Sequence, residues 1–239
     1  MPMGLTSENV AERYGISRQD QDLFAAESHR RAARARQNGH FQKEIIPVDT
    51  FIQEVDRQGA NIGDGPKNIR VTEDDGIRSS ISLEALAKLK SPFKEGGAST
   101  AGNSSQISEG AAALVLMRRS IATALWLLDR IIEKSCTCYT GSARAAGLEQ
   151  YRCRPLEINE AFANQSIYCL RELGLEEAWE MELVNPDGGA IALSHPLGAT
   201  GARMESTLLH GLERTDGRVS VVSMCVGTGM GIASVFVRE

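Results

Sequence analysis

The sequence predicts an α/β fold, because short apolar runs that resemble strands alternate with segments of helical character in its last third. Three of these runs lead directly into a reactive or polar residue: residues 156–158 into Asn159, residues 190–193 into His195 and residues 219–224 into Cys225. Strand ends are where α/β proteins keep their chemistry, because a rigid sheet fixes the geometry of the loops that follow. A carboxamide, an imidazole and a thiol gathered in one pocket suit acyl-transfer or carbanion chemistry.

From residue 156 onward the predicted order is strand, helix (160–173), loop, strand, helix, strand, turn and strand. The second of these helices opens with Gly198-Ala199-Thr200-Gly201. Glycine there allows close approach of backbone to backbone, and the free N–H groups of the helix start would face the His195 loop.

Composition indicates an ordinary globular protein of one large domain or two small ones. The 239 residues are 42% hydrophobic and 24% charged, so the chain can bury a substantial core. A net charge of −5 argues against nucleic acid as the main partner. The five cysteines, odd in number and irregular in spacing, favour a reducing intracellular compartment over a disulfide scaffold. No apolar run approaches membrane-spanning length, so we expect no membrane partner.

The two ends of the chain carry no recognisable targeting signal. The opening Met-Pro-Met-Gly-Leu-Thr has neither a signal-peptide apolar region nor transit-peptide character. Residues 237–239 are not a peroxisomal C-terminal address. We therefore expect any targeting segment to lie upstream of this chain.

Two helices are predicted in the first forty residues. Thr6 or Ser7 can cap a helix that runs to residue 14 and stops at Gly15, and Ser17 can cap a longer one that ends before Gly39. The second helix is expected to bury a stripe made of Leu23, Phe24 and the alanines at positions 26, 32 and 33.

Four arginines, Arg30, Arg31, Arg34 and Arg36, crowd the C-terminal half of this second helix, where cations suit the helix dipole. They form either a solvated basic face or a phosphate-binding patch. The sequence by itself leaves both interpretations open.

Residues 41–97 alternate β-like runs, at 45–48 and 51–55, with polar turns, and residues 64–66 are a strong breaker. A short helix is expected over residues 81–89, and Gly96-Gly97 opens a flexible stretch. The polar turn at residues 101–105 precedes a predicted strand at 111–117.

Residues 121–155 fit this pattern poorly. Residues 121–132 are apolar enough for a buried helix or strand, but Cys136, Cys138 and Cys153 follow without periodicity. A Cys-x-Cys pair can belong to a zinc site, yet the spacing is poor and no histidine lies nearby, so we expect no metal.

Three sequence blocks, NEAF at 159–162, GGAIALSHPLGATGAR at 188–203 and SMCVGTGMG at 223–231, resemble the active-site signatures of the 3-ketoacyl-CoA thiolases. The peroxisomal type of this family is the most similar, and NEAF separates it from the sterol-carrier branch. The resemblance extends to residues 3–11 and 100–105, lapses over 121–155, and begins in the middle of the family's sequence.

The resemblance implies an incomplete thiolase fold without the N-terminal half that carries the nucleophile. Residues 1–118 would be the thiolase loop domain followed by the last strand of the N-terminal half. Residues 119–155 would be an irregular, divergent joint, and residues 156–239 the C-terminal thiolase domain. In the family the loop domain covers the acyl-CoA.

The resemblance also implies roles for the residues of the three blocks. His195 would activate the nucleophile and donate to the thioester oxygen, and Cys225 would be the general acid/base that protonates the enolate carbon. Asn159 would hold a water in the first oxyanion hole, and the Gly227 N–H would help to form the second. These residues should converge on one cavity, with the His195 and Cys225 side chains within about 5 Å.

Coenzyme A would be a substrate, with no cofactor required. By motif match Ser105 would contact its pantetheine arm, although a simple polar turn explains that residue equally well. Arg30, Arg31 and Arg34 would bind its nucleotide phosphates. The family further implies a homodimer, fatty acid β-oxidation, and a peroxisomal or mitochondrial location.

The chain departs from the family in two places. None of its five cysteines lies in the Cys-Ser/Ala-Ser/Gly-Gly elbow that carries the family's nucleophile, so we expect an acyltransferase by ancestry that is inactive alone. The alternatives are a non-catalytic acyl-CoA-binding or subunit-interacting remnant, and a truncated product without function. Ser194 replaces a glycine before the histidine; if that position has positive φ, its Cβ costs about 1 kcal/mol.

Overall fold

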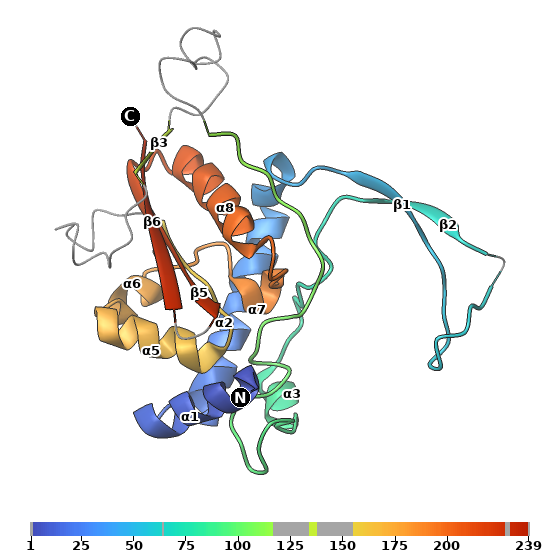
Figure 1. Ribbon diagram of the computed structural model, residues 1–239, viewed down its shortest axis with the longest axis horizontal. Coiled ribbons are helices and arrows are strands. Elements are labelled where there is room, and N and C mark those ends of the chain that lie inside the picture. Colours follow the sequence, from blue (N-terminus) through green and yellow to red (C-terminus); the bar gives the residue numbers. More distant parts are fainter. Residues whose placement is uncertain (1, 64, 117–133, 138–154, 228–229, 239) are drawn as a thin grey trace, which may run out of the picture.

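The computed structural model describes residues 2–63, 65–116, 134–137, 155–227 and 230–238 (Figure 1). The main body is a four-stranded sheet with helices on both faces, and the two-stranded β1–β2 hairpin projects away from it (Figure 1). Strands and helices thus build the α/β fold expected from the sequence. No helix within the described ranges is long and apolar enough to cross a bilayer.

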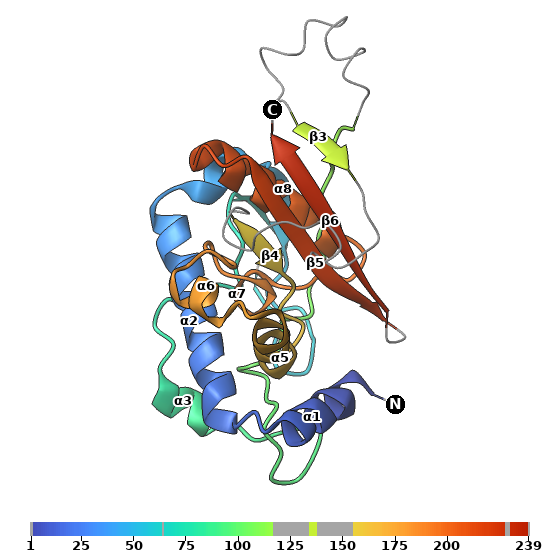
Figure 2. The same cartoon turned by 90° about the vertical axis from the view of Figure 1, so that its left-hand side faces the viewer.

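The sheet has the strand order β3-β6-β5-β4. Its strands are β3 (Lys134–Thr137), β4 (Leu156–Ile158), β5 (Val219–Gly227) and β6 (Met230–Arg238). β4 runs parallel to β5, whereas β5 and β6 form a long antiparallel pair (Figure 2). The strands predicted at 156–158 and 219–224 are confirmed.

β3 corrects the expectation that residues 119–155 are irregular throughout. Its four residues pair antiparallel with the outer side of β6, from Lys134 opposite Arg238 to Thr137 opposite Val235. Pairing with a long neighbouring strand can override a weak local pattern, because much of β-propensity is tertiary context. Apart from this strand and Pro155, the segment lies outside the described residues.

Helices α5 (Ala163–Leu173) and α8 (Thr200–Arg214) cover opposite faces of the sheet. Alternation along β5 separates the two cores, since Val221 packs in the cluster with α5 and Val222 in the cluster with α8. The short helix α6 (Glu176–Glu180) joins the first cluster through Ala178. The helix predicted over 160–173 is confirmed, beginning at Ala163.

Both N-terminal helices are present. α1 (Met3–Tyr14) begins before the expected caps, directly after Pro2, and ends as predicted at Gly15, whose φ is 62°. α2 (Arg18–Gln37) begins with a capping box between Ser17 and Asp20, and Gly39 follows its end with φ 72°. Gly15 and Gly39 adopt left-handed backbone, which glycine enters at least cost.

The stripe predicted for α2 is correct for Phe24, Ala32 and Ala33, which are buried, but wrong for Leu23, which is 44% exposed. Phe24 stacks on Trp179 at 4.3 Å between ring centroids. Leu23 precedes Phe24 by one position and therefore points about 100° away from it around the helix, outside the core.

The run at 190–193 is a one-turn helix, α7 (Ala190–Leu193), and the strand expected there is wrong. All four of its residues are buried, and a short apolar run buried on every side has no periodicity that separates strand from helix. Two long-range contacts hold its start, because the Gly189 N–H donates to Ser28 Oγ at 3.1 Å and the Ile191 N–H to the Glu160 carboxylate at 3.2 Å.

The β-like runs near residue 50 become one strand, β1 (Val48–Ile52), paired with β2 (Lys67–Val71). In the chain, the 3-10 helix η1 (His40–Lys43) precedes this hairpin and α3 (Leu83–Ala87) follows it. Both pack against α2, and α3 confirms the helix predicted over 81–89.

Residues 110–116 form neither helix nor strand, which corrects the strand predicted at 111–117 as far as it is described. Val115 and Leu116 are 76% and 69% exposed. A strand requires a hydrogen-bonded neighbour, and the described part of the chain provides none for this segment.

Candidate functional site

His195 lies in the short loop between α7 and α8. Its backbone N–H donates to the Gln106 carbonyl at 2.9 Å, and the Gln106 side chain in turn donates to the carbonyls of Ile191 at 2.9 Å and Gly76 at 2.8 Å. The histidine loop is therefore anchored to the segment that follows the Ser105 turn.

The residue before His195 has a strained backbone conformation. Ser194 has φ 76° and ψ 164°, a region that is essentially restricted to glycine. The position that the family fills with glycine therefore has positive φ here, and a serine Cβ is held there directly beside the histidine.

The imidazole of His195 is bonded at both nitrogens and is only 8% exposed. Nδ1 lies 2.6 Å from Thr200 Oγ1, and Nε2 lies 3.3 Å from Asn159 Nδ2. Burial, and secondarily the positive charge of Arg203, lowers the pKa of His195 below its ordinary value. The ring is therefore neutral at neutral pH, as a base that accepts a proton must be.

Asn159 is fixed by the end of β4. Its backbone N–H donates to the Ser223 carbonyl of β5 at 2.9 Å, so the strand pairing places it at the edge of the sheet. Its side chain is buried, and among the described residues its Oδ1 has no hydrogen-bond partner. A buried acceptor without a partner is rare in proteins and marks a position for a bound donor.

Cys225 and Gly227 lie at the far end of β5. Ser223 and Cys225 project from the same side of the strand, and Asn159 is bonded to the Ser223 carbonyl, so Cys225 lies one step beyond the asparagine. The ladder with β6 is irregular between Cys225 and Gly227, where Gly227 has φ 86°. The thiol is free and half-buried. Among the described residues no hydrogen bond joins Cys225 to His195, and their separation stays a prediction.

The polar turn predicted at 101–105 packs directly against the 159–162 block. The Ser105 N–H donates to the Ala161 carbonyl at 3.0 Å, and Ser104 forms a β-bridge with Phe162. Asn103 anchors the turn from below, since its side chain donates to Asp22 of α2 at 2.8 Å. The half-buried Ser105 therefore borders the segment that holds Asn159.

Glu160 is a supporting residue that sequence reasoning did not single out. Its carboxylate is fully buried and accepts hydrogen bonds from Ser28 Oγ at 2.6 Å, Asn185 Nδ2 at 2.8 Å and the Ile191 N–H. Burial raises the pKa of Glu160, and these hydrogen bonds only partly counter it. The carboxylate links α2, α7 and the 159–162 block. Its one visible signal in the sequence is a charged residue two positions after the end of a buried strand.

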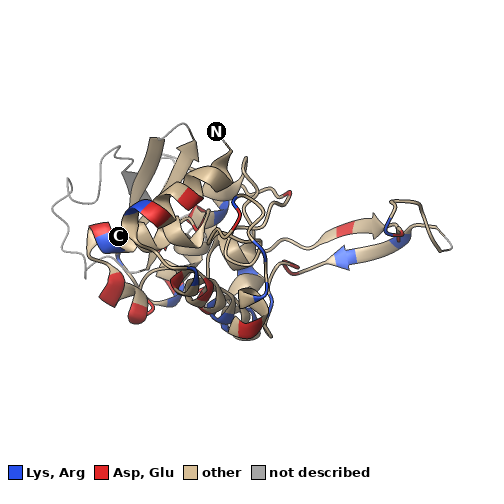
Figure 3. Cartoon of the chain, turned by 90° about the horizontal axis from the view of Figure 1, so that it is seen from below, with Lys and Arg blue, Asp and Glu red and all other residues tan. Residues whose placement is uncertain are grey.

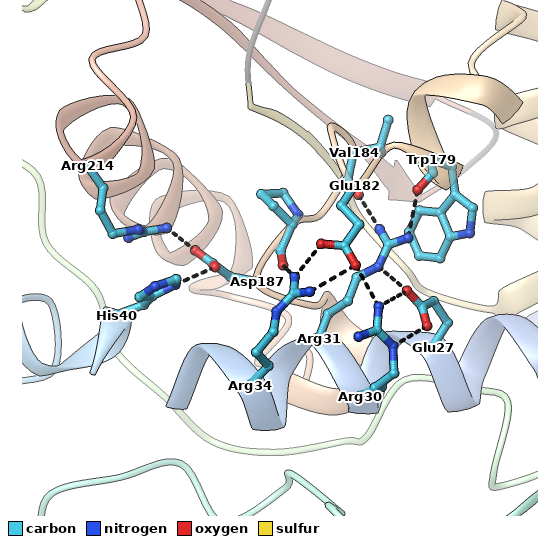
Figure 4. A network of polar contacts seen from close by, with 11 residues as sticks. Glu27, Arg30, Arg31, Arg34, His40, Trp179, Glu182, Val184, Asp187 and Arg214 are labelled. Atoms are coloured by element: carbon cyan, nitrogen blue, oxygen red, sulfur yellow. Dashed lines mark hydrogen bonds and ion pairs between the residues drawn. The ribbon is translucent and has the colours of Figure 1, made fainter. Parts of the chain in front are cut away.

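Three of the arginines of α2 are ion-paired, Arg31 with Glu27 and both Arg30 and Arg34 with Glu182 (Figure 4). Arg31 is 1% exposed and donates to the carbonyls of Val184 and Trp179, both at 2.7 Å, while its guanidinium lies 3.7 Å from the Trp179 ring centroid. Arg31 thus holds the residue 179–184 loop against α2, and its donors face inward.

Arg30 and Arg34 share Glu182, each at 2.6 Å. Arg34, followed by Arg30, lowers the pKa of Glu182 to about 2. Within the described residues, the one ion pair of the Arg36 side chain is a long contact of 3.8 Å with Glu73. More generally, Figure 3 shows basic (blue) and acidic (red) segments interspersed over the helices of the body.

A cavity of about 590 Å³ opens between α2 and the segment that leads into α3. Arg30, Arg34 and Glu27 supply its charged wall, and its remaining lining residues are Leu23, Ala26, Ala33, Gln37, Ser79, Ile81 and Leu83. The exposed position of Leu23 is thereby explained, since it faces this cavity.

Within the described ranges no group of histidine, cysteine and carboxylate side chains could hold a metal ion. Cys138 and Cys153, which the Cys-x-Cys pattern brought into consideration, lie outside the described residues.

Comparison with known proteins identifies the family. Residues 1–120 match the model of the thiolase N-terminal domain, and residues 137–238 match that of the thiolase C-terminal domain. The chain is 48% identical over 252 residues to rat 3-ketoacyl-CoA thiolase B, peroxisomal, covering 99% of this chain and 57% of the relative. It is 50% identical over 252 residues to the human peroxisomal 3-ketoacyl-CoA thiolase, with the same two coverages of 99% and 57%.

Solved structures agree with this result. The dimeric peroxisomal thiolase of Saccharomyces cerevisiae matches with a TM-score of 0.80 and 38% identity, covering 100% of this chain and 59% of the yeast chain. The acetyl-CoA acetyltransferase of Bacillus anthracis matches with a TM-score of 0.83 and 34% identity, covering 100% of this chain and 60% of the other.

The fold and the histidine–asparagine site define an α/β protein of the thiolase type. The chain belongs to the thiolase family, and it spans a little over half the length of these relatives. The resemblance to the thiolase family and the thiolase fold expected from the sequence are both confirmed.

Proposed function

We propose that this chain carries the proton-transfer and coenzyme A-binding part of a thiolase-type acyltransferase that acts on 3-ketoacyl-CoA and acetyl-CoA. The contact between His195 and Asn159 carries the proposal, because it joins two of the family's signature blocks at 3.3 Å around a neutral imidazole. The unpaired Asn159 Oδ1 supports it, because it offers a buried acceptor at the same place.

In this proposal the C–C bond of the 3-ketoacyl-CoA breaks to leave an acyl group on a nucleophile and the enolate of acetyl-CoA. His195 takes the proton of the nucleophile and later donates to the thioester oxygen. Asn159 Oδ1 accepts from a water that stabilises the first oxyanion, and the Gly227 N–H helps to stabilise the second. Cys225 returns a proton to the enolate carbon.

The nucleophile is the part that this chain does not provide by itself. None of the cysteines at 136, 138, 153, 169 and 225 has the expected elbow sequence. A positioned nucleophile supplies about 7 kcal/mol or more of the barrier reduction. We infer that the chain alone shows no thiolysis above the buffer rate and forms no acyl adduct detectable by mass spectrometry.

A half-reaction tests the proposal on the chain as it is, because enolate formation does not use the missing nucleophile. In D₂O the Cys225 thiolate would take one methyl proton from acetyl-CoA, and the enolate would take a deuteron back from the exchanged thiol. We expect mass spectrometry of acetyl-CoA to show deuterium uptake above buffer that Cys225→Ser and His195→Ala abolish. Cys169→Ser is the matched control, because this second free thiol lies on α5 near Cys225 and should not be needed. Uptake unaffected by Cys225→Ser would refute the assignment.

For coenzyme A we propose two contacts. The Ser105 turn, which borders the 159–162 block, would meet the pantetheine arm, and the cavity walled by Arg30 and Arg34 would take the nucleotide end. We do not propose that Arg31 contacts coenzyme A, because its guanidinium already donates to Val184, Trp179 and Glu27 inside the protein.

Calorimetry tests this binding mode. Phosphate would compete with Glu182 for Arg34, so we expect binding at low ionic strength that weakens as salt screens the charges. Arg34→Gln should weaken it, whereas Arg36→Gln, outside the cavity on the same helix, should not. Equal affinity of the two variants would show that the nucleotide binds elsewhere.

A second candidate is a non-catalytic acyl-CoA-binding or subunit-interacting protein, favoured by the lack of the cysteine elbow. Coenzyme A binding without deuterium uptake would select this candidate.

By similarity to the peroxisomal relatives and the dimeric yeast enzyme, we infer a peroxisomal homodimer in fatty acid β-oxidation. We keep as a proposal the division into a loop domain with its following strand (1–118), a joint (119–155) and a C-terminal domain (156–239). The N-terminal family match ends near the first boundary, whereas the C-terminal match begins at residue 137, inside the joint.

A further inference from the structure

The hydrogen bonds around Thr200 determine which nitrogen of His195 carries the proton. Thr200 Oγ1 lies 2.7 Å from the Pro196 carbonyl oxygen and 2.6 Å from His195 Nδ1. A hydroxyl has one proton to donate, and a carbonyl oxygen has none. Two oxygens 2.7 Å apart require a proton between them, so the hydroxyl donates to Pro196 and must accept from His195 Nδ1–H.

We propose that Thr200 is a positioning residue that holds His195 in the Nδ1–H tautomer, with the Nε2 lone pair directed at the site. The arrangement is rigid, since Thr200 is 0% exposed at the first turn of α8 and its backbone N–H also donates to Pro196 O at 2.9 Å. The protonation of one imidazole nitrogen is set by the hydrogen bond that the other makes.

The same tautomer orients Asn159. Because Nε2 is an acceptor, the group facing it at 3.3 Å has to be the Asn159 NH₂, and Oδ1 is turned to the opposite side. Oδ1 is the buried acceptor that has no partner among the described residues. Thr200 therefore orients the Asn159 amide indirectly: it sets the tautomer of His195, and that tautomer determines which way Asn159 Oδ1 points.

The chemical consequence rests on the proposed function, whereas the tautomer itself does not. With the proton on Nδ1, Nε2 can accept a proton from a thiol, and Asn159 Oδ1 can hold a water by accepting from it. The opposite tautomer would place an N–H where the base is needed and would turn the asparagine amide over.

Two-bond ¹H–¹⁵N NMR of the labelled chain tests the tautomer directly, because protonated and unprotonated imidazole nitrogens have well separated ¹⁵N shifts. At pH 8 we expect His195 Nδ1 to have the shift of a protonated nitrogen and Nε2 that of an unprotonated one. His210, whose Nδ1 lies 2.9 Å from the Ser206 carbonyl, is an internal reference for an Nδ1–H ring. A protonated Nε2 on His195 in the unmodified chain would overturn the proposal without any variant.

Variants separate positioning from simple packing. Thr200→Val keeps the shape but removes the acceptor, so the Nε2–H form should appear. Thr200→Ser keeps the hydroxyl and should retain Nδ1–H. Acetyl-CoA deuterium uptake should fall at least tenfold in Thr200→Val and remain within about twofold in Thr200→Ser. Nδ1–H in both variants would refute the role of Thr200. No uptake by the unmodified chain, with Nδ1–H present, would refute the proposed function and leave the tautomer assignment intact.

Discussion

Replacing Ser194 by glycine should stabilise the protein, although most substitutions of buried residues destabilise. Its φ of 76° and ψ of 164° lie where a Cβ is strained, which costs about 1–3 kcal/mol. Removing the Cβ relieves this strain, but glycine also gives the unfolded chain more conformational freedom, which lowers the stability of the folded state by about 0.4–1 kcal/mol. In the described part of the chain the hydroxyl of Ser194 makes no hydrogen bond, so its loss subtracts nothing further. The two ranges allow a net change of about 0 to 2.6 kcal/mol, and taking low with low and high with high values the expected gain for Ser194→Gly is roughly 0.5–2 kcal/mol.

Urea unfolding followed by circular dichroism measures this gain in free energy directly. Thermal unfolding is a second measurement, in which the melting temperature of a chain of this size should rise by roughly 1–8 °C, at about 2–4 °C per kcal/mol. Ser194→Ala is the matched control: it removes the hydroxyl but keeps the Cβ, and so should match the unmodified chain. A glycine variant no more stable than the alanine variant would show that the backbone here is unstrained.

Two further stability measurements test the charged groups. Burial raises the pKa of Glu44 to about 7, which its Thr207 hydrogen bond and Arg203 only partly offset, so the folded state retains a proton that the unfolded state releases. The free energy of unfolding should therefore fall as pH rises from about 4.5 through 7, by up to roughly 3 kcal/mol from this group. Glu44→Gln should remove this part of the pH dependence. An unchanged pH dependence in the variant would contradict the role of Glu44. Arg31→Met should cost about 3–5 kcal/mol, because it leaves the Val184 and Trp179 carbonyls without their donor and removes one of the two arginines paired with Glu27. The more exposed Arg34→Met should cost at most about 1 kcal/mol. Equal losses in urea unfolding would contradict the structural role of Arg31.

Local signals in the sequence correctly located the ends of the first two helices and two of the strands. Gly15, Ser17 and Gly39 marked the ends of α1 and α2 correctly, because caps and left-handed turns depend on the residue itself and its immediate neighbours. β4 and β5 were equally visible as apolar runs. The motif, in which the family has glycine at position 194, raised the question of positive φ there but did not predict it.

Features decided by distant contacts were not visible. The run at 190–193 looked like a strand and folds as α7, because Ser28 and Glu160 bind the N–H groups at its start from elsewhere in the chain. The arginines of α2 resembled a basic patch because Glu182, which neutralises two of them, lies about 150 residues further along. Neither partner can be read from the local sequence.

The site keeps its geometry because both sides that shape it belong to this chain. Gln106 holds the backbone of His195, and the Ser105 turn holds the block that contains Asn159. On the other side, Thr200 contacts the His195 imidazole and the Ser223 carbonyl of β5 holds the Asn159 backbone. The proton-transfer groups are thus positioned by residues 103–106 together with residues 159–225, and none of these contacts uses a nucleophile. Enolate chemistry should therefore be separable from acyl transfer in this protein, which is why deuterium exchange and thiolysis are expected to give opposite results on the same sample.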